Sequence, residues 1–260
     1  MLLKYNYHTH TYRCGHAKGN DEDYVIHAIE CGYKVLGFSD HVMLKGYSQL
    51  GIRGNYDQLD DYVFSINQLK EKYANQIEIH VGMEAEYFPS MIDYYHELIN
   101  SGTIEYLILG QHCFINEKNE FQWYLGLDNK IQRIEHYVHD LIEGMATGLF
   151  AYVAHPDFFI RLFREYDPII DKFSREICKA SIKYNVPLEM NVSGVQPRLL
   201  NEDNLHYPNE HFWKIAGELG VKTVIGVDAH NPEEFENSNY NLVFQMIEQY
   251  NINFIEDFKL

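Results

Sequence analysis

The chain has 260 residues, of which 46% are hydrophobic, and a formal net charge of −17 at pH 7. A chain of this length can bury a full hydrophobic core, so we expect a single domain over residues 1–260. The strong negative charge disfavours nucleic acid as a partner, because binding to nucleic acid depends on contacts between basic side chains and phosphates. A small molecule is the favoured ligand.

Residues 1–7 lack the apolar stretch of a signal peptide, and no window of the sequence approaches the roughly 18 apolar residues of a membrane span. The four cysteines include no CxxC pair. We expect them to be free thiols, because a chain of this size does not need disulfide bonds to fold. These features predict a soluble, cytoplasmic protein without a membrane partner, and they leave its oligomeric state open.

Short apolar runs alternate with longer amphipathic stretches along the whole chain. The apolar runs predict seven strands, at residues 4–10, 34–39, 77–84, 105–111, 150–155, 187–191 and 222–227. The amphipathic stretches predict helices at residues 21–32, 56–73, 89–100, 129–148, 168–184, 208–220 and 232–250. Several of these stretches begin near a proline or end at a glycine, as helix termini commonly do.

Strands and helices in strict succession are typical of a parallel sheet with helical crossovers. Seven or eight such units commonly close into a barrel whose functional site lies at the carboxyl ends of the strands. We therefore expect an α/β fold, a single-domain (β/α)7 barrel similar to a TIM barrel. An open, doubly wound sheet is the alternative.

Histidines gather at the carboxyl ends of the predicted strands. Of fourteen histidines, seven lie at such an end or just beyond it: His8, His10, His16, His41, His112, His155 and His230. Two carboxylates, Glu84 and Asp228, occupy equivalent positions. A lone histidine at a strand end is more often hydrogen-bonded or on the surface than a ligand. Six of the seven strands, however, place a histidine or a carboxylate at the same edge of the sheet. Chance is a poor explanation for this arrangement.

These residue types are the ligands of transition metals. His8 and His10 are two residues apart, so on a strand both rings point to the same side and can bind one cation. Imidazole and carboxylate together suit Zn, Mn or Fe. A carboxylate such as Glu84 can also bridge two ions and offset their charge. Because nine ligands exceed the needs of one site, we predict two to three divalent ions.

The remaining candidates have simpler explanations. His136 and His139 are three residues apart on a predicted helix, which favours a solvated helix face. Cys14 and Cys113 neighbour proposed ligands, but we expect them to pack in the core. We interpret the other histidines as structural: His27, His80, His96, His206 and His211. The sequence contains no P-loop, HExxH or GxSxG motif, so it does not support a nucleotide loop, a zincin or a serine hydrolase.

The order of the motifs resembles that of the polymerase-and-histidinol-phosphatase (PHP) superfamily over nearly the whole chain. The motifs are His8-x-His10-Thr11, His16, Asp40-His41, Glu84, His112, His155-Pro156 and Asp228-Ala229-His230. The resemblance implies a distorted seven-stranded (β/α) barrel. It also implies one metal held by His8, His10, Glu84 and Asp228, a second by Glu84, His112 and His155, and a third by His16, His41 and His230.

Within the superfamily, a free-standing chain of this length resembles the histidinol-phosphatases of histidine biosynthesis, which convert L-histidinol phosphate to L-histidinol and phosphate. The resemblance implies phosphate-binding arginines at Arg161 and Arg198, and catalytic roles for Glu84, Asp228 and His230. Metal ions would lower the pKa of a bound water toward 7 and neutralise the phosphate oxygens. For the ammonium group of histidinol phosphate, the strand-end loops offer the carboxylates Glu86, Glu117 and Asp157.

Two alternatives to this substrate remain open. The segment from residue 13 to 16, Arg-Cys-Gly-His, differs from the proline-containing version expected in close relatives. The chain is therefore also compatible with a PHP phosphoesterase that acts on another small phosphorylated metabolite or a nucleotide. The second alternative is a non-catalytic metal-binding module, which the complete ligand set argues against.

Overall fold

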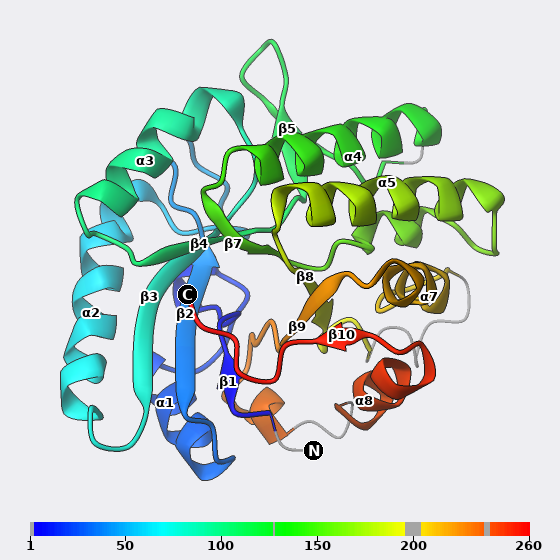
Figure 1. Ribbon diagram of the computed structural model, residues 1–260. Coiled ribbons are helices and arrows are strands. Elements are labelled where there is room, and N and C mark those ends of the chain that lie inside the picture. Colours follow the sequence, from blue (N-terminus) through cyan, green and yellow to red (C-terminus); the bar gives the residue numbers. More distant parts are fainter. Residues whose placement is uncertain (1–2, 127, 196–203, 237–239) are drawn as a thin grey trace.

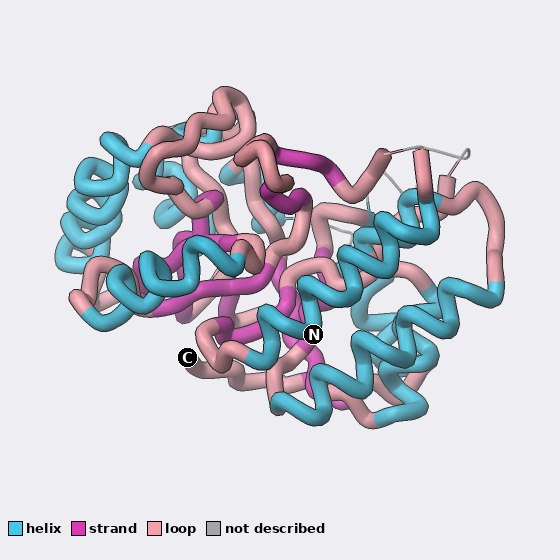
Figure 2. Tube along the Cα trace, turned by 90° about the horizontal axis from the view of Figure 1, so that it is seen from above, coloured by secondary structure: helices cyan, strands magenta, loops and turns pink. Residues whose placement is uncertain are grey.

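The computed structural model describes residues 3–126, 128–195, 204–236 and 240–260. Its main sheet contains eight parallel strands in the order β1-β2-β3-β4-β7-β8-β9-β10. The strands curl around a common centre (Figure 1). Seen from above, the helices lie outside the strands (Figure 2). This architecture confirms the expected α/β fold of the distorted TIM-barrel type.

The strands of the main sheet are β1 (Tyr5–Asn6), β2 (Val35–His41), β3 (Glu78–Ala85), β4 (Tyr106–Leu109), β7 (Phe150–Val153), β8 (Leu188–Asn191), β9 (Lys222–Gly226) and β10 (Asn253–Phe254). An antiparallel hairpin is formed by β5 (Cys113–Ile115) and β6 (Phe121–Trp123). The helices are α1 (Asp21–Glu30), α2 (Leu59–Lys72), α3 (Ile92–Asn100), α4 (Lys130–Ala146), α5 (Pro168–Tyr184), α7 (Glu210–Leu219) and α8 (Tyr240–Gln249). Short 3-10 segments are η1 (Tyr12–Cys14), η2 (Tyr56–Gln58), η3 (Pro89–Met91), η4 (Phe158–Leu162) and η5 (Pro232–Glu236).

All seven predicted strands are present, but several are shorter than predicted. The chain leaves the regular ladder before the histidines of the first, fourth and fifth strands, so these histidines lie in the loops at the barrel mouth. Two features were not predicted from the sequence: β10, which pairs with β9, and the hairpin of β5 and β6 after β4. Strands of two or three residues are too short to produce a periodic pattern.

The first and last parts of the sheet meet, which favours the barrel over an open sheet. Thr9 and Ala229 form a parallel bridge beyond the ends of β1 and β9. His10 N donates to Ala229 O at 2.9 Å, and Ala229 N donates to His8 O at 3.2 Å. The open, doubly wound alternative is therefore wrong. As a consequence, the segment after β1 lies directly beside the segment after β9.

Tyr106 fills the barrel interior beneath this closure. Its hydroxyl lies 2.8 Å from Tyr7 O and 3.0 Å from Phe38 O. Two neighbouring strands carry glycine beside the ring, and a Cβ at Gly82 would lie 2.3 Å from Tyr106 Cε1, while one at Gly37 would lie 2.3 Å from the Tyr106 hydroxyl. The interior is therefore packed, as in other barrels of this type, and ligands must approach from the strand ends.

The helices form where the sequence carries both an amphipathic pattern and end signals. In α5, the Asp167 side chain accepts a hydrogen bond from Ile169 N at 3.0 Å, Pro168 opens the first turn, and Asn185 ends the helix in the left-handed conformation. Its apolar face is buried and packs against α4 and α7. Over the described parts of the chain, no helix combines the length and apolarity needed to cross a bilayer. The four cysteines are free, as predicted.

Candidate metal centre

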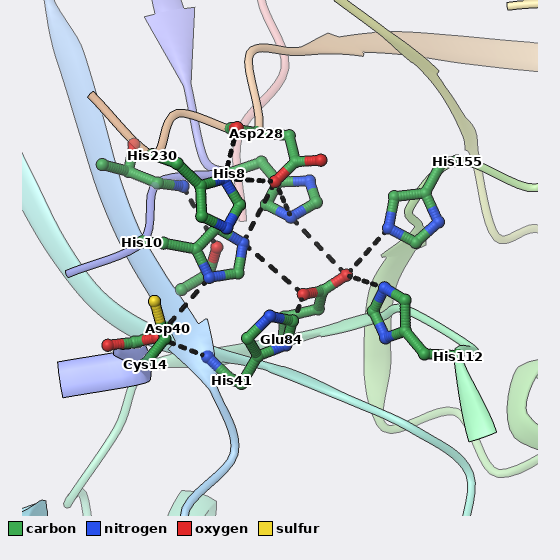
Figure 3. A network of polar contacts seen from close by, with 12 residues as sticks. His8, His10, Cys14, Asp40, His41, Glu84, His112, His155, Asp228 and His230 are labelled. Carbon is green, nitrogen blue, oxygen red and sulfur yellow. Dashed lines mark hydrogen bonds and ion pairs between the residues drawn. The ribbon is translucent and has the colours of Figure 1, made fainter. Parts of the chain in front are cut away.

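The nine proposed ligands converge at the carboxyl ends of the strands. His8, His10 and His16 follow β1, His41 ends β2, Glu84 lies near the end of β3, His112 follows β4, His155 follows β7, and Asp228 and His230 follow β9. Figure 3 labels eight of them, all except His16, arranged around Glu84 and Asp228. Six of the nine are buried, His112 and His230 are partly exposed, and His16 lies at the exposed edge of the cluster.

Glu84 is the centre of this cluster, because five imidazole rings surround its carboxylate. The two shortest contacts, both 3.0 Å, join His155 Nε2 to Glu84 Oε1 and His41 Nδ1 to Glu84 Oε2. The corresponding distances are 3.5 Å for His10 and 3.6 Å for His8 and His112. Both carboxylate oxygens therefore face histidine nitrogens, which is the arrangement that a bridging ligand needs.

Asp228 forms a second negative group beside the first. Its Oδ1 lies 3.1 Å from His10 Nε2, 3.4 Å from His8 Nε2 and 3.4 Å from His230 Nδ1. Further out, ligand atoms of His16, His41 and His230 lie within 4.8 Å of one another. The rings of His16 and His230 are stacked, with centroids 4.6 Å apart.

The hydrogen-bonding state of the cluster fits bound cations. Several nitrogen and oxygen atoms are fully buried without a hydrogen-bond partner among the described residues: His8 Nε2, both ring nitrogens of His10, His41 Nδ1, Glu84 Oε2, His155 Nδ1 and His230 Nε2. Buried polar atoms are normally satisfied, because an unpaired one costs free energy. These atoms also belong to the groups whose spacing suits a metal ion, such as His8, His10 and Glu84, or His41, Glu84 and His112.

The pKa values in the cluster diverge because negative and positive groups are packed together out of water. Burial opposes ionisation of Glu84, but the neighbouring imidazoles hold its pKa well below the usual range. Burial and the charge of His10 lower the pKa of His41 to about 4 and that of His230 to about 3. His10 goes the other way: burial is outweighed by Asp228, Asp40 and Glu84, which raise its pKa to about 9. The site thus offers ionised carboxylates and the neutral imidazoles of His41 and His230, the states that metals bind, whereas His10 must lose a proton before it binds a cation.

The outer nitrogens of the ligand histidines contact carboxylates that had not been predicted from the sequence as partners of these rings. Asp40 Oδ1 lies 3.5 Å from His10 Nδ1, and Glu86 Oε1 lies 3.4 Å from His112 Nδ1. Glu189 on β8 lies 2.8 Å from His8 Nδ1. Such partners orient a metal-binding ring and fix its tautomer. The available signal was the presence of charged residues in otherwise apolar strands.

Two of the three carboxylates proposed for the ammonium group are already engaged. Glu86 is buried and forms an ion pair of 2.8 Å with the buried Arg53. Asp157 is buried and accepts hydrogen bonds from Asn209 N at 2.7 Å and Trp213 Nε1 at 3.1 Å. Both therefore have structural partners, which argues against a role in binding the ammonium group. Glu117 lies in the exposed turn of the β5–β6 hairpin.

Arg161 lies next to the cluster, in η4. Its guanidinium carbon is 5.1 Å from the centroid of the Phe158 ring. Phe158 in turn packs against His112 and His155, with ring centroids 5.6 Å and 5.5 Å apart. Arg161 is thus one side chain removed from the proposed ligands. Arg198, the second predicted phosphate-binding residue, lies outside the described residues.

A cavity of about 180 Å³ opens above the cluster. Its floor consists of proposed ligands, including Glu84, Asp228 and His230, and its walls include Ile52, Trp123 and Tyr207. Trp123 comes from the unpredicted hairpin and is 41% exposed, so its ring is accessible to a ligand. The site therefore combines a polar, charged floor with apolar and aromatic walls, which is typical of a small-molecule pocket.

Cys14 also lies at the cluster, with its sulfur in a group with His10 and His230 within 4.8 Å. The sulfur accepts a hydrogen bond from Ala17 N at 3.3 Å, and burial raises the pKa of the thiol to about 12. A protonated thiol with this partner is consistent with packing. His136 and His139 lie on α4 outside every group of residues spaced for a metal in the described chain.

Comparison of the sequence with known families and proteins finds matches over most of the chain. The family model described as the PHP domain matches residues 6–193. A probable histidinol-phosphatase of Deinococcus radiodurans is 25% identical over 239 residues, which cover 87% of this chain and 86% of that protein. A probable histidinol-phosphatase of Schizosaccharomyces pombe is 23% identical over 259 residues, which cover 90% of this chain and 83% of that protein.

Solved structures share the fold. The histidinol phosphate phosphatase of Lactococcus lactis, crystallised with zinc, L-histidinol and phosphate, has a TM-score of 0.74 and 17% identity, with 98% of this chain and 96% of that chain covered. The putative histidinol phosphatase of Listeria monocytogenes has a TM-score of 0.71 and 19% identity, with coverage of 92% and 99%. At these identities the likeness shows a common fold.

Proposed function

This chain belongs to the PHP domain family, and from that membership we propose that it is a metal-dependent phosphatase that hydrolyses L-histidinol phosphate to L-histidinol and phosphate. The observation that carries the proposal is the buried Glu84 carboxylate with five imidazole nitrogens within 3.6 Å. The two relatives named probable histidinol-phosphatases support the substrate, since each aligns with most of this chain.

Two or three divalent ions, Zn, Mn or Fe, would occupy the cluster. His8, His10, Glu84 and Asp228 would hold the first, Glu84, His112 and His155 the second, and His16, His41 and His230 the third. Bound ions of this kind supply a water of lowered pKa and neutralise the phosphate oxygens that this water approaches. Glu84 belongs to both of the first two sets, so its negative charge would offset that of two neighbouring cations.

The chain's own residues position the reacting groups. Asp228 is ionised, because His8, His10 and His230 outweigh the effect of burial and hold its pKa far below the usual range. Its carboxylate borders the cavity and is suited to accept a hydrogen bond from the attacking water. His230 also borders the cavity, but burial and the charge of His10 lower its pKa to about 3, so its neutral ring is suited to hold the third ion and not to give a proton to the leaving alkoxide. The negative charge of that alkoxide would be offset by the cation. Arg161, with Arg198, would hold phosphate oxygens through charged hydrogen bonds.

The rest of the substrate meets the cavity walls. Histidinol phosphate carries an imidazole ring, which can stack on Trp123 or Tyr207. Its ammonium group can lie over the same aromatic faces, because cations are attracted to the negative face of a ring. This assignment takes over the role that the sequence analysis gave to Glu86 and Asp157, whose carboxylates are occupied by other residues.

The test is steady-state phosphate release by the protein reconstituted with Mn, Zn or Fe. L-histidinol phosphate and p-nitrophenyl phosphate are assayed separately as substrates. We expect kcat/KM for L-histidinol phosphate to be higher by at least about 10²-fold, because a site built for a polar substrate rejects simpler analogues that strongly. Comparable values for both substrates would contradict the histidinol phosphate assignment and leave a general phosphatase. If neither substrate released phosphate, the proposal that the protein is a phosphatase would be contradicted.

A further inference from the structure

β8 contributes no proposed metal ligand, yet two of its side chains contact three of the ligands. Glu189 and Asn191 are two residues apart on this strand, so both point to the barrel interior. Both are completely buried. They lie between β7, which leads to His155, and β9, which leads to Asp228. A buried carboxylate and a buried amide at this position need an explanation, because an unpaired polar group here would be costly.

Glu189 uses its two oxygens for two different ligands. Its Oε1 lies 2.8 Å from His8 Nδ1, and its Oε2 accepts a hydrogen bond of 3.1 Å from His155 N. The first contact makes Nδ1 of His8 the protonated nitrogen, so Nε2 presents its lone pair toward Glu84 and Asp228. The second contact holds the backbone of His155 in a conformation that side chains rarely adopt, with φ of 30°.

Asn191 connects this carboxylate to Asp228. Its amide nitrogen donates to Glu189 Oε2 at 3.0 Å and to Asp228 Oδ2 at 3.2 Å. Its amide oxygen accepts from Gly194 N at 3.1 Å, which fixes the orientation of the amide. Asp228 also has a left-handed backbone, with φ of 56°. With Oδ2 engaged by Asn191, Oδ1 is the oxygen that faces His8 and His10.

The packing around Glu189 shows that the sheet is shaped to hold it. A Cβ at Gly226, on the neighbouring strand β9, would lie 1.7 Å from Glu189 Oε1. Among the ion pairs of the described residues, the cationic partner of Glu189 is the ring of His8.

From these contacts we infer that Glu189 and Asn191 are positioning residues of the metal centre, which set the ring tautomer of His8, the backbone of His155 and the carboxylate of Asp228 from one strand. The inference rests on the proposed metal site. The strand that lacks ligands thereby has a definite role, because it converts three ligands from three other segments into one preorganised set. Substituting either residue should weaken metal binding while the fold persists.

The decisive variant is Glu189→Gln. A carboxylate accepts hydrogen bonds at both oxygens, whereas an amide accepts at one and donates from the other, so the variant cannot satisfy both His8 Nδ1–H and His155 N–H. We expect the zinc affinity of the full chain, measured by competition with a chromophoric chelator, to fall by about 10- to 100-fold, the usual effect of losing such a partner. The visible spectrum of the Co²⁺-loaded protein should change, because the ligand field of His8 changes.

The matched control is Glu105→Gln. Glu105 also contacts a histidine through its carboxylate, at 2.7 Å from His80 Nδ1, but the pair lies at the opposite end of the barrel. We expect its zinc affinity and Co²⁺ spectrum to match those of the wild type. Zinc should also raise the melting temperature of the wild type and of Glu105→Gln by equal amounts, and that of Glu189→Gln by less, because ligand stabilisation follows affinity. A merely structural role would lower the melting temperatures with and without zinc and leave their difference unchanged.

The outcomes separate this inference from the proposed function. If the wild type binds zinc and Glu189→Gln binds it equally well with an unchanged spectrum, the positioning role is wrong and the proposed function stands. If the wild type itself binds no zinc, the metal centre is wrong. Should Glu189→Gln fail to fold, Asn191→Ala answers the same question through Asp228. It should reduce zinc affinity at least several-fold, and undiminished affinity would overturn the inference.

Discussion

Glu84 on β3 and Gly110 after β4 are so close that a Cβ at position 110 would lie 1.8 Å from Glu84 Oε1. The missing side chain of one residue thus creates the space for the central carboxylate of the metal centre. A distance of 1.8 Å is far inside van der Waals contact, and Gly110 does not have the left-handed backbone that would itself require glycine. Its identity is therefore explained by the position of Glu84.

Gly110→Ala should displace the Glu84 carboxylate and lower kcat/KM by about 10²-fold or more, because a shift of about 1 Å at a reacting centre costs that much. The measurement is steady-state hydrolysis after metal reconstitution. The control is Gly148→Ala, in a turn where an added Cβ meets no atom within 4 Å. The left-handed backbone of Gly148, with φ of 70°, makes alanine strained there, so this variant controls for a loss of stability without displacement of Glu84. Activity of Gly110→Ala within a few-fold of this control would show that the carboxylate tolerates displacement.

Glu84→Gln should nearly abolish turnover, although the side chain keeps almost the same volume. The neutral amide cannot offset the charge of two cations, and it offers one acceptor oxygen instead of two. His139→Ala is the comparison, because His139 is exposed on α4, away from the cluster, and it should retain activity near that of the wild type. Equal losses in the two variants would mean that the site has been misplaced.

Metal analysis of the reconstituted protein should find two or three transition-metal ions per chain. Nine ligands are more than one site can use, since sites for these ions have about four to six positions. Inductively coupled plasma mass spectrometry after removal of excess metal gives the number directly. A value of one or less would contradict a multinuclear centre, and removal of the metal with a chelator should abolish phosphate release.

Metal affinity should rise with pH up to about pH 9. In the metal-free protein burial opposes protonation of His10, but Asp228, Asp40 and Glu84 outweigh it and raise its pKa to about 9, so the ring carries a proton at pH 7. A cation must displace that proton, and the apparent affinity then increases by about tenfold per pH unit for each proton released. Zinc affinity measured at about pH 7 and pH 8 tests the slope, and proton release can be measured by titration calorimetry in two buffers. A flat profile would mean that His10 binds no metal.

Arg161→Ala should raise KM and reduce kcat/KM by the equivalent of about 1.5 to 3 kcal/mol, the value of a lost charged hydrogen bond. The same loss should appear with L-histidinol phosphate and with p-nitrophenyl phosphate, because both carry the phosphate group. A loss confined to L-histidinol phosphate would place Arg161 at the alcohol half of the substrate instead. Arg198→Ala should behave like Arg161→Ala.

The sequence by itself predicted the fold class and the nine candidate ligands. Helices such as α5 carry their end signals locally, in Asp167, Pro168 and Asn185, so nearby residues determine where they begin and end. Histidines at strand ends are informative for a similar reason: parallel strands bring their carboxyl ends to one face whatever the remaining details. The pattern along the chain was therefore sufficient to predict that His8, His112 and Asp228 lie close together.

Only the tertiary structure decided how these residues are held. The closure of the barrel at Thr9 and Ala229, the space at Gly110 and the contact between Glu189 and His8 each join residues that are far apart in the sequence. Periodicity cannot report such contacts, because it describes which face a side chain occupies and not what it meets there. For the same reason the sequence could not show that Glu86 is paired with Arg53, because Arg53 comes from a loop without a periodic pattern.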